Sequence, residues 1–442
     1  MKNETKAEKL LEALNDIPDD MIIAAQPSQT AKKRRLPLWV KISSAAAAVA
    51  VCAVSAGVLI NLFSNGSVAP VDSACGTLKA DENLPKITAE VKFGAMGFEG
   101  ILTADISDYA SANPWKQEQG IAVMPVYKNR VAKDIGSSVI TDVDYQTVVD
   151  ELKSLLIDTA ARLGVTVTEA DITDNGYPEE DWEKIAQGYE AATRMPVPKG
   201  YFIPQQFRAV TDDYTITTDN DYVTTIEFTK PTEVPVDMHS TEFDAVSQAA
   251  EYLKSEYSAL IGMDEPTIAI DGGDYTYNGN KTWYEIAFYD AAGTVEQDIE
   301  NYFMNFIKFY ADDSGKLYLI RIFRYDLAGE LVGNYPLLTV EQAAEMLQNG
   351  EYASSVPLGK DYKPESYARA ELGYRTGIGD EYYLPYYKFW VDVTEELSTE
   401  GFVIEDGFRN YGAFYVPAVL PEYIEDIPTY DGGFNGGLGL PK

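Results

Sequence analysis

Residues 42–63 form a run of 22 residues without a charged side chain, and this run constrains the fold more than any other feature. At about 1.5 Å per residue, a helix of this length spans roughly 33 Å, enough for the hydrocarbon core of a bilayer. Basic residues precede it at Lys32, Lys33, Arg34, Arg35 and Lys41, and Trp39 is placed for the headgroup interface. The positive-inside rule then predicts a transmembrane helix over residues 38–63, with residues 1–37 in the cytoplasm and the C-terminal domain outside the cell.

We interpret this segment as an uncleaved signal anchor and not as a signal peptide. About thirty residues, six of them acidic, come before the basic cluster, whereas the basic region of a signal peptide stands at the N-terminus. The small residues Ser67-Val68-Ala69 are followed by Pro70, which disfavours cleavage after them. The sequence therefore predicts a single-pass protein of the cell membrane.

The predicted cytoplasmic head carries one narrow apolar stripe. Leu10, Leu14 and Ile17 recur at helical spacing, with Leu11 beside them. About 37 residues are too few to bury a core of their own. We therefore expect the stripe either to lie on the membrane or to dock a cytoplasmic regulator, and both alternatives stay open.

The charge of the chain is strongly acidic, and it is concentrated after the apolar run. The net charge is −35, although residues 1–63 carry eight basic and six acidic side chains. The remaining 379 residues carry 27 basic and 64 acidic side chains, a net charge of −37. Such a field repels phosphate backbones, so we expect no nucleic acid as a partner.

Few residues of the chain are suited to catalysis or to metal binding. Cys52 lies in the apolar run and Cys75 just beyond it, which excludes a disulfide framework. His239 is the single histidine, and no nucleophile motif such as G-x-S-x-G accompanies it. Acidic segments such as residues 211–222 lack the spacing of a calcium loop, and no phosphate-binding P-loop is present. We expect no catalytic residue, no metal and no cofactor.

Between two flexible segments, the sequence repeats one arrangement. Residues 64–85 are polar and read as a stalk, and residues 431–442 are Gly-rich and read as a disordered tail. The segments "QAAEYLKSEY" and "QAAEMLQNGEY" are 94 residues apart and have helical spacing, and a looser helix at residues 142–164 has a stripe of Val148, Leu152, Leu155 and Leu156. Strand-like runs follow each helix. This pattern predicts an α+β fold of repeated helix plus antiparallel sheet units at residues 86–235, 236–335 and 336–430.

The stretch "DEYYLPYYKFWVDV", residues 380–393, holds six aromatic rings. An aromatic-aromatic-aliphatic-proline pattern recurs at residues 201–204, 382–385 and 414–417, and proline marks the edge or interruption of a strand. Core packing accounts for most such rings. Tyr382, Tyr386 and Trp390 point to the second face of the strand, however, and an uncovered face would bind a sugar or a peptide.

Several segments resemble known proteins. The head "LLEALNDIPDDMIIAA" and the basic, Ala/Val-rich region after it resemble the heads of single-pass membrane proteins of anaerobic Firmicutes. "GFEGILTADISDYASANPW", "MPVYKNR", "YLPYYKFWV" and "YGAFYVPAV" resemble the ectodomain of one such uncharacterised family. Related heads occur on regulators of extracytoplasmic-function sigma factors, although this head has no Cys or His before residue 52 and so departs from the zinc-binding anti-sigma type. "TVEQAAEML" with "LPYYKFWV" resembles, more distantly, the PepSY-like ectodomains of cell-wall kinase regulators.

Together these features predict a non-enzymatic, membrane-anchored sensory or regulatory protein of the cell envelope. Its expected partners are the lipid bilayer, a cytoplasmic regulator at the head, and a cell-wall or peptide ligand. The alternative is a surface glycan-binding or glycan-cleaving protein that uses Tyr382, Tyr386 and Trp390. A covered aromatic face favours the first prediction, and an open groove with two facing carboxylates favours the second.

Overall fold

The computed structural model describes residues 78–89, 91, 98–133, 143–291, 293–377, 379–399, 407–430 and 432. The predicted head, transmembrane helix, most of the stalk and almost all of the tail lie outside the described residues. So do Leu10, Leu11, Leu14, Ile17, Cys52 and Cys75. The described residues all belong to one unit, Ala74–Lys442, and among them no helix is long and apolar enough to cross a membrane.

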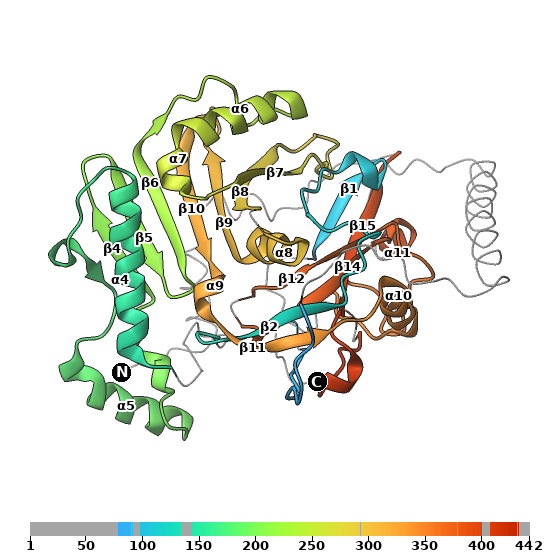
Figure 1. The fold of residues 1–442 in the computed structure, drawn as a ribbon, viewed down its shortest axis with the longest axis horizontal. Coiled ribbons are helices and arrows are strands. Elements are labelled where there is room, and N and C mark those ends of the chain that lie inside the picture. Colours follow the sequence, from blue (N-terminus) through green and yellow to red (C-terminus); the bar gives the residue numbers. More distant parts are fainter. Residues whose placement is uncertain are drawn as a thin grey trace, which may run out of the picture. The chain divides into compact units, whose positions relative to one another are not determined.

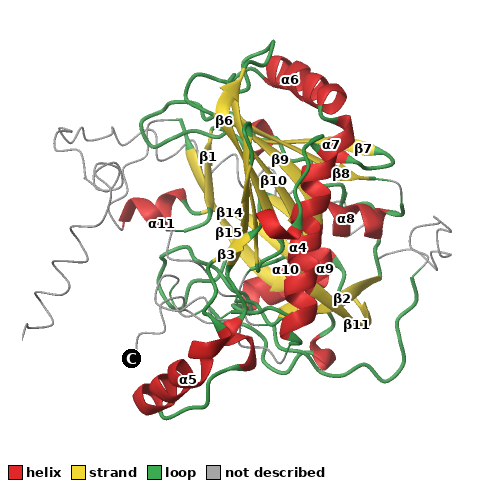
Figure 2. Ribbon diagram, turned by 90° about the vertical axis from the view of Figure 1, so that its left-hand side faces the viewer, coloured by secondary structure: helices red, strands yellow, loops and turns green. Residues whose placement is uncertain are grey.

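Helices and antiparallel sheets make up the described part of the chain, which confirms the predicted α+β class (Figures 1 and 2). Every pairing between two named strands is antiparallel. Antiparallel neighbours need no crossover helix, and the strands of the largest sheet follow one another as two meanders.

The largest sheet joins two meanders into eight strands. Its order is β3 (Thr173–Asp174), β4 (Gln206–Val210), β5 (Tyr214–Asp219), β6 (Val223–Thr232), β10 (Leu317–Arg324), β9 (Asn305–Ala311), β8 (Tyr284–Asp290) and β7 (Pro266–Gly272). The meanders meet where β6 pairs with β10. Helix α4 (Tyr145–Arg162) packs on β4 and β5, and α6 (Phe243–Glu256) packs on β7 and β8. Each of these helices therefore covers strands that follow it in sequence.

These helices form where the apolar spacing predicts them. In α4, Val148, Leu152 and Leu156 are buried. The two repeated Gln-Ala-Ala-Glu segments lie in α6 and in α10 (Val340–Asn349), and each buries its leucine, Leu253 or Leu347. A buried face at helical spacing thus fixes the position of each helix against its sheet.

The second sheet has the order β1 (Gly100–Thr103), β15 (Arg409–Pro417), β14 (Pro385–Asp392) and β12 (Arg369–Tyr374). Helix α8 (Val295–Met304) lies between this sheet and the eight-stranded sheet, since it contacts β12 as well as β8 and β9 (Figure 1). Helix α10 packs on β15. Helix α8 therefore brings one face of the second sheet close to β8 and β9.

A third sheet takes one strand from each unit predicted from the sequence. Its order is β11 (Gly329–Pro336), β2 (Val123–Asn129) and β13 (Tyr382–Tyr383). The boundaries of the predicted units stay predictions. Strands of these units share sheets and one continuous core. Asp81, at the end of the predicted stalk, exchanges two hydrogen bonds with Asn334 of β11, at 3.0 and 2.7 Å. This end of the segment is thus bound to the sheet.

Two elements differ from the expectation drawn from the sequence. Strand β5 lies inside an acidic, Thr-rich segment, and it forms because Ile216 and Thr218 point inward from alternate positions. Helix α5 (Glu179–Thr193) buries no residue completely, and its Trp182 stacks on Phe202 with 4.9 Å between ring centroids. The remaining helices are α7 (Ser258–Ile261), α9 (Tyr325–Ala328) and α11 (Thr394–Thr399).

Candidate functional site

The aromatic stretch of residues 382–391 divides between two sheets. Tyr382 lies on β13, half-buried and opposite Lys128 of β2. Tyr386 and Trp390 lie on one face of β14, where they are 3% and 4% exposed. The structure therefore brings Tyr386 and Trp390 together and leaves Tyr382 in another sheet. The three rings form no exposed platform, and their role in ligand binding stays a prediction.

The three proline patterns stand at strand ends, as expected, but not at matched positions of repeated units. Pro204 comes just before β4, Pro385 begins β14 after the break that follows β13, and Pro417 ends β15. Each proline thus lies where a strand starts or stops, because it has no N–H to donate to a neighbouring strand.

Lys388 stands between Tyr386 and Trp390 on the same face of β14. The register places Glu371 of β12 on one side of Lys388 and Tyr415 of β15 on the other. Lys388 Nζ lies 3.2 Å from Glu371 Oε2 and 4.6 Å from the centroid of the Trp390 ring. The ammonium group therefore pairs with a carboxylate and also lies against an indole ring.

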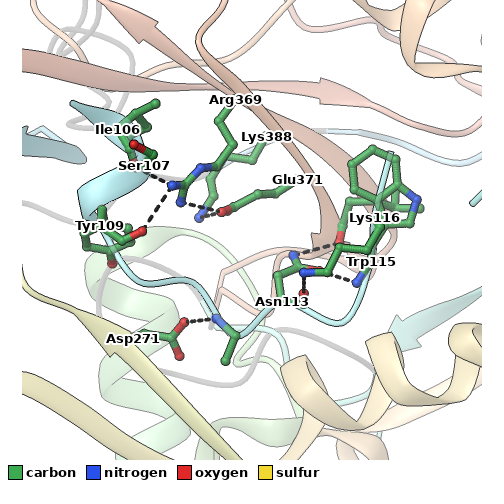
Figure 3. A network of polar contacts seen from close by, with 12 residues as sticks. Ile106, Ser107, Tyr109, Asn113, Trp115, Lys116, Asp271, Arg369, Glu371 and Lys388 are labelled. Carbon is green, nitrogen blue, oxygen red and sulfur yellow. Dashed lines mark hydrogen bonds and ion pairs between the residues drawn. The ribbon is translucent and has the colours of Figure 1, made fainter. Parts of the chain in front are cut away.

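Arg369, on β12, fastens a loop to this face of the sheet. The loop is residues 104–122, between β1 and β2 (Figure 3). Arg369 Nη2 donates to the backbone oxygen of Tyr109 at 3.1 Å and to that of Ile106, and Nη1 lies 3.7 Å from Glu371 Oε1. One guanidinium group thus joins the loop to the Lys388–Glu371 pair.

The same loop is attached to both sheets farther along its course (Figure 3). The Asn113 side chain donates to the backbone oxygen of Leu372 on β12 at 3.1 Å. Asp271 of β7 accepts a hydrogen bond from Ala112 N at 2.8 Å, and the Tyr302 hydroxyl donates to Asp271 at 3.0 Å. The loop therefore bridges the second sheet and the edge of the eight-stranded sheet.

Glu99, just before β1, completes the network. The Tyr415 hydroxyl donates to Glu99 Oε1, and Arg375 Nη1 lies 3.6 Å from Glu99 Oε2. The Arg375 guanidinium lies over the Tyr415 ring, with its Cζ 4.5 Å from the centroid. Charged groups of both signs thus line one face of the second sheet.

Two cavities open on this network and meet at Lys388 and Glu99. One has a volume of about 300 Å³, and its lining includes Asn113, Arg375 and Tyr386. The other has a volume of about 400 Å³, and its lining includes Tyr109, Asp271, Asp274 and Trp390. We call the two together the Lys388 cleft. Its size falls in the range of small-molecule sites in proteins.

Burial and charge pairing act in opposite directions on the ion pair. Burial lowers the pKa of Lys388, but the Glu371 carboxylate, with help from Tyr415 and Glu99, raises that pKa above its ordinary value. Burial raises the pKa of Glu371, but Lys388 and a hydrogen bond from Ser111 hold it below its usual range. Both groups are therefore ionised at neutral pH, and the cleft holds a fixed pair of charges.

Trp390 Nε1 and Glu371 Oε1 are buried polar atoms without a hydrogen-bond partner among the described residues, although Glu371 Oε1 lies 3.7 Å from Arg369 Nη1. A buried polar atom without a hydrogen-bond partner costs roughly 1–3 kcal/mol, so such atoms are rare in folded proteins. Glu371 lines the smaller part of the Lys388 cleft and Trp390 the larger part, so a polar group in either part can contribute a hydrogen bond.

The cleft has the chemistry of a binding site, and in the described part of the chain no three His, Cys, Asp or Glu side chains are grouped to hold a metal ion. The sequence prediction missed Arg369, Glu371 and Lys388. The sequence signal for them is a charged residue within an otherwise apolar strand. Lys388 stands among six aromatic residues, and Arg369 and Glu371 are two residues apart on β12. A charged residue at a buried strand position is costly unless it is paired or functional.

Comparison of the chain with known protein families found no match, and comparison with curated proteins found none.

Proposed function

We propose that this chain is a non-enzymatic sensory or regulatory protein of the cell envelope, anchored by one transmembrane helix at residues 38–63. Its head lies in the cytoplasm, its α+β domain of repeated units lies outside the cell, and the Lys388 cleft binds the ligand. The uncharged run at residues 42–63 with its basic flank supports the anchor and the orientation. The resemblance to single-pass membrane proteins of anaerobic Firmicutes supports the same assignment.

The observation that carries the proposal is the buried charge network of the Lys388 cleft. Replacing a buried ion pair by apolar residues is often neutral or stabilising, so Lys388 and Glu371 are not needed for packing alone. The indole Nε1 of Trp390, which has no hydrogen-bond partner among the described residues, adds a further cost. Proteins retain costs of this kind at sites where recognition matters more than stability.

In this proposal the ligand signal reaches the cell interior through the head. Leu10, Leu11, Leu14 and Ile17 form the surface that docks the cytoplasmic regulator. The transmembrane helix connects this surface with the domain that holds the cleft. Ligand binding at the cleft then changes the affinity of the head for its regulator, and regulator binding changes the affinity of the cleft for its ligand.

The test is co-sedimentation of the full-length chain, in detergent, with isolated cell-wall fragments. We expect Lys388→Met and Trp390→Phe to weaken binding about tenfold or more, since each removes a charged or buried donor. Lys230→Met is the matched control, because Lys230 is exposed on β6 and outside the cleft. Unchanged binding of both cleft variants, with native circular dichroism, would contradict the cleft as the ligand site.

A second candidate is a surface protein that binds or cleaves glycans. Asp271 and Asp274 line the same cavity as the exposed Trp283, so carboxyl groups and an aromatic ring on which a sugar can stack share one cavity. Cleavage predicts new reducing ends after incubation with cell-wall fragments, and their loss in Asp271→Asn. If the protein binds glycans without cleaving them, no new reducing ends appear.

A further inference from the structure

A third cavity continues the Lys388 cleft. It has a volume of about 150 Å³, and His239, Lys308 and Tyr310 are part of its lining. Trp283 and Glu285 line both this cavity and the part of the cleft that contains Trp390. The three cavities therefore follow one another, and each shares two residues with the next.

We propose that the three cavities form one elongated groove that binds a polysaccharide strand over several sugar units. This inference rests on the proposed ligand-binding role of the Lys388 cleft, and it adds the class and the length of the ligand. A small ligand would fill one cavity, whereas a chain of linked sugars would occupy all three in succession.

Aromatic rings stand along the groove at separate places. Trp283, at the junction with the third cavity, is 54% exposed, and its ring stacks on His239 with 4.4 Å between centroids. Tyr109 and Trp390 line the middle cavity, with 6.4 Å between their centroids. Of these rings, the exposed Trp283 offers an apolar face to a sugar ring.

Between the rings, the lining holds a donor and an acceptor without a hydrogen-bond partner among the described residues, although the acceptor belongs to an ion pair with Arg369. Trp390 is 4% exposed, and its Nε1 is a donor without a partner among the described residues. Glu371 is 8% exposed, and its Oε1 is an acceptor without a hydrogen-bond partner among the same residues. A hydroxyl group donates and accepts, so it satisfies either atom. A simple cation would leave the indole donor unsatisfied, and a simple anion would leave the carboxylate oxygen unsatisfied.

The charge of the groove disfavours anionic polymers. Acidic residues outnumber basic ones along its lining: Glu99, Asp271, Asp274, Glu285 and Glu371 against Lys308, Arg375 and Lys388. Two of the bases are neutralised, because Lys308 lies 2.7 Å from Glu285 and Lys388 lies 3.2 Å from Glu371. Such a lining repels phosphate-bearing chains and accepts neutral or amino sugars.

Peptide ligands fit the lining less well. Peptide recognition uses apolar pockets for alternate side chains or the free edge of a strand. Of the described residues that line either part of the Lys388 cleft, Ile101 is the only aliphatic one. A sugar chain needs rings and hydrogen-bonding groups instead, which this lining supplies.

The test is titration calorimetry of the full-length chain, in detergent, with N-acetylglucosamine oligomers from the monomer to the hexamer. These probes are uncharged and differ only in length. We expect the affinity to rise with each added unit until the groove is filled, because each further unit engages another part of it.

Two variants distinguish an elongated groove from a single cavity. Trp283→Ala is expected to weaken hexamer binding about tenfold and to leave monomer binding unchanged. Trp390→Phe keeps the ring but removes the N–H donor, and it is expected to weaken binding at every length. Tyr177→Ala is the matched control, because Tyr177 is 52% exposed and lies outside the groove, and it is expected to change nothing.

Each other outcome overturns a defined part of the proposal. If the monomer binds as tightly as the hexamer and Trp283→Ala has no effect, the elongated groove is wrong and the cleft alone is the site. If no oligomer binds while cell-wall fragments still bind through Lys388, the sugar class is wrong and the proposed function stands. If neither binds, both fail.

Discussion

Asp219, the last residue of β5, has a half-buried carboxyl group close to that of Asp221. Burial raises its pKa to about 6, and the neighbouring Asp221 adds to the increase, while Lys133 and two backbone N–H groups oppose it. Those N–H groups belong to Asp221 and Val223, at 3.0 and 3.1 Å from Asp219 Oδ1. The folded protein therefore favours the neutral form of this side chain more than the unfolded chain does.

The pH dependence of stability follows from this shift. Because the pKa is raised on folding, Asp219 favours the fold at acidic pH, and that contribution is lost as the pH rises from the unfolded value of 3.8 through about 6. Asp219→Asn keeps the oxygen that accepts both hydrogen bonds and removes the charge. We expect it to raise the free energy of unfolding near pH 8 by up to about 3 kcal/mol, relative to its effect near pH 4.

Urea unfolding at the two pH values measures this difference. Asp212→Asn, at an exposed position of the turn before β5, is the control and is expected to change little. An equal effect of Asp219→Asn at both pH values would show that the charge of Asp219 does not oppose folding.

At the level of single residues, the sequence indicated the aromatic residues of the cleft more readily than its charged residues. Tyr386 and Trp390 attract notice because aromatic density is visible along the chain. Glu371 and Lys388 do not, since their pairing depends on which residue of β12 lies opposite β14. A shift of one residue in that register would turn Lys388 away from Glu371, and no local pattern fixes the register.

Among the elements, α8 packs directly on β12 of the second sheet. Gly373 of β12 leaves room for it: a Cβ atom at this position would lie 2.2 Å from the Phe303 ring. We expect Gly373→Ala to lower the free energy of unfolding by about 1–3 kcal/mol, because α8 or the ring must move. Urea unfolding with a matched Gly359→Ala control measures the loss, since nothing lies within 4 Å of a Cβ at Gly359.

A second substitution tests whether the crowding arises at Phe303. Gly373→Ala combined with Phe303→Leu is expected to recover part of the lost stability, because the smaller side chain leaves space for the new methyl group. If the double variant is less stable than both single variants together predict, the contact between α8 and β12 is not the cause.

The elements that the sequence predicted are those with local signals. The helix at α4 has a periodic apolar stripe, and the hairpin between β9 and β10 has the turn residues Asp312 and Gly315. Strand β5 was missed, because threonine and aspartate dominate it and only Ile216 is strongly apolar. Its burial comes from the neighbours β4 and β6, which the segment itself does not specify.

At the scale of the whole molecule, the described strands are interlocked beyond the limits of the predicted units. The sheet β11-β2-β13 needs residues from all three, and one core runs through them. We expect residues 78–430 to unfold in one cooperative transition. Far-ultraviolet circular dichroism and tryptophan fluorescence, followed in the same urea titration of the full-length chain, are expected to give coincident curves.

If circular dichroism and fluorescence instead gave separate unfolding transitions, the three predicted units would be independently stable. The sequence suggests such independence, because its repeats recur at intervals and each begins with a helix. Pairings between distant segments leave no periodic trace in the sequence, so the joining of repeats into shared sheets could not be predicted from it.

One pairing between distant segments determines when strand β1 can gain its partner during synthesis of the chain. Among the described strands, β1 pairs with β15 alone, and Gly100 lies opposite Gly412, 312 residues later. At a synthesis rate of roughly 5–20 residues per second, this partner emerges on the order of 15–60 s after β1. For that time Ile101 and Leu102, which end fully enclosed, have no strand beside them. Among the described strands, β1 is thus one of the last to gain its partner, although it is one of the first to be synthesised.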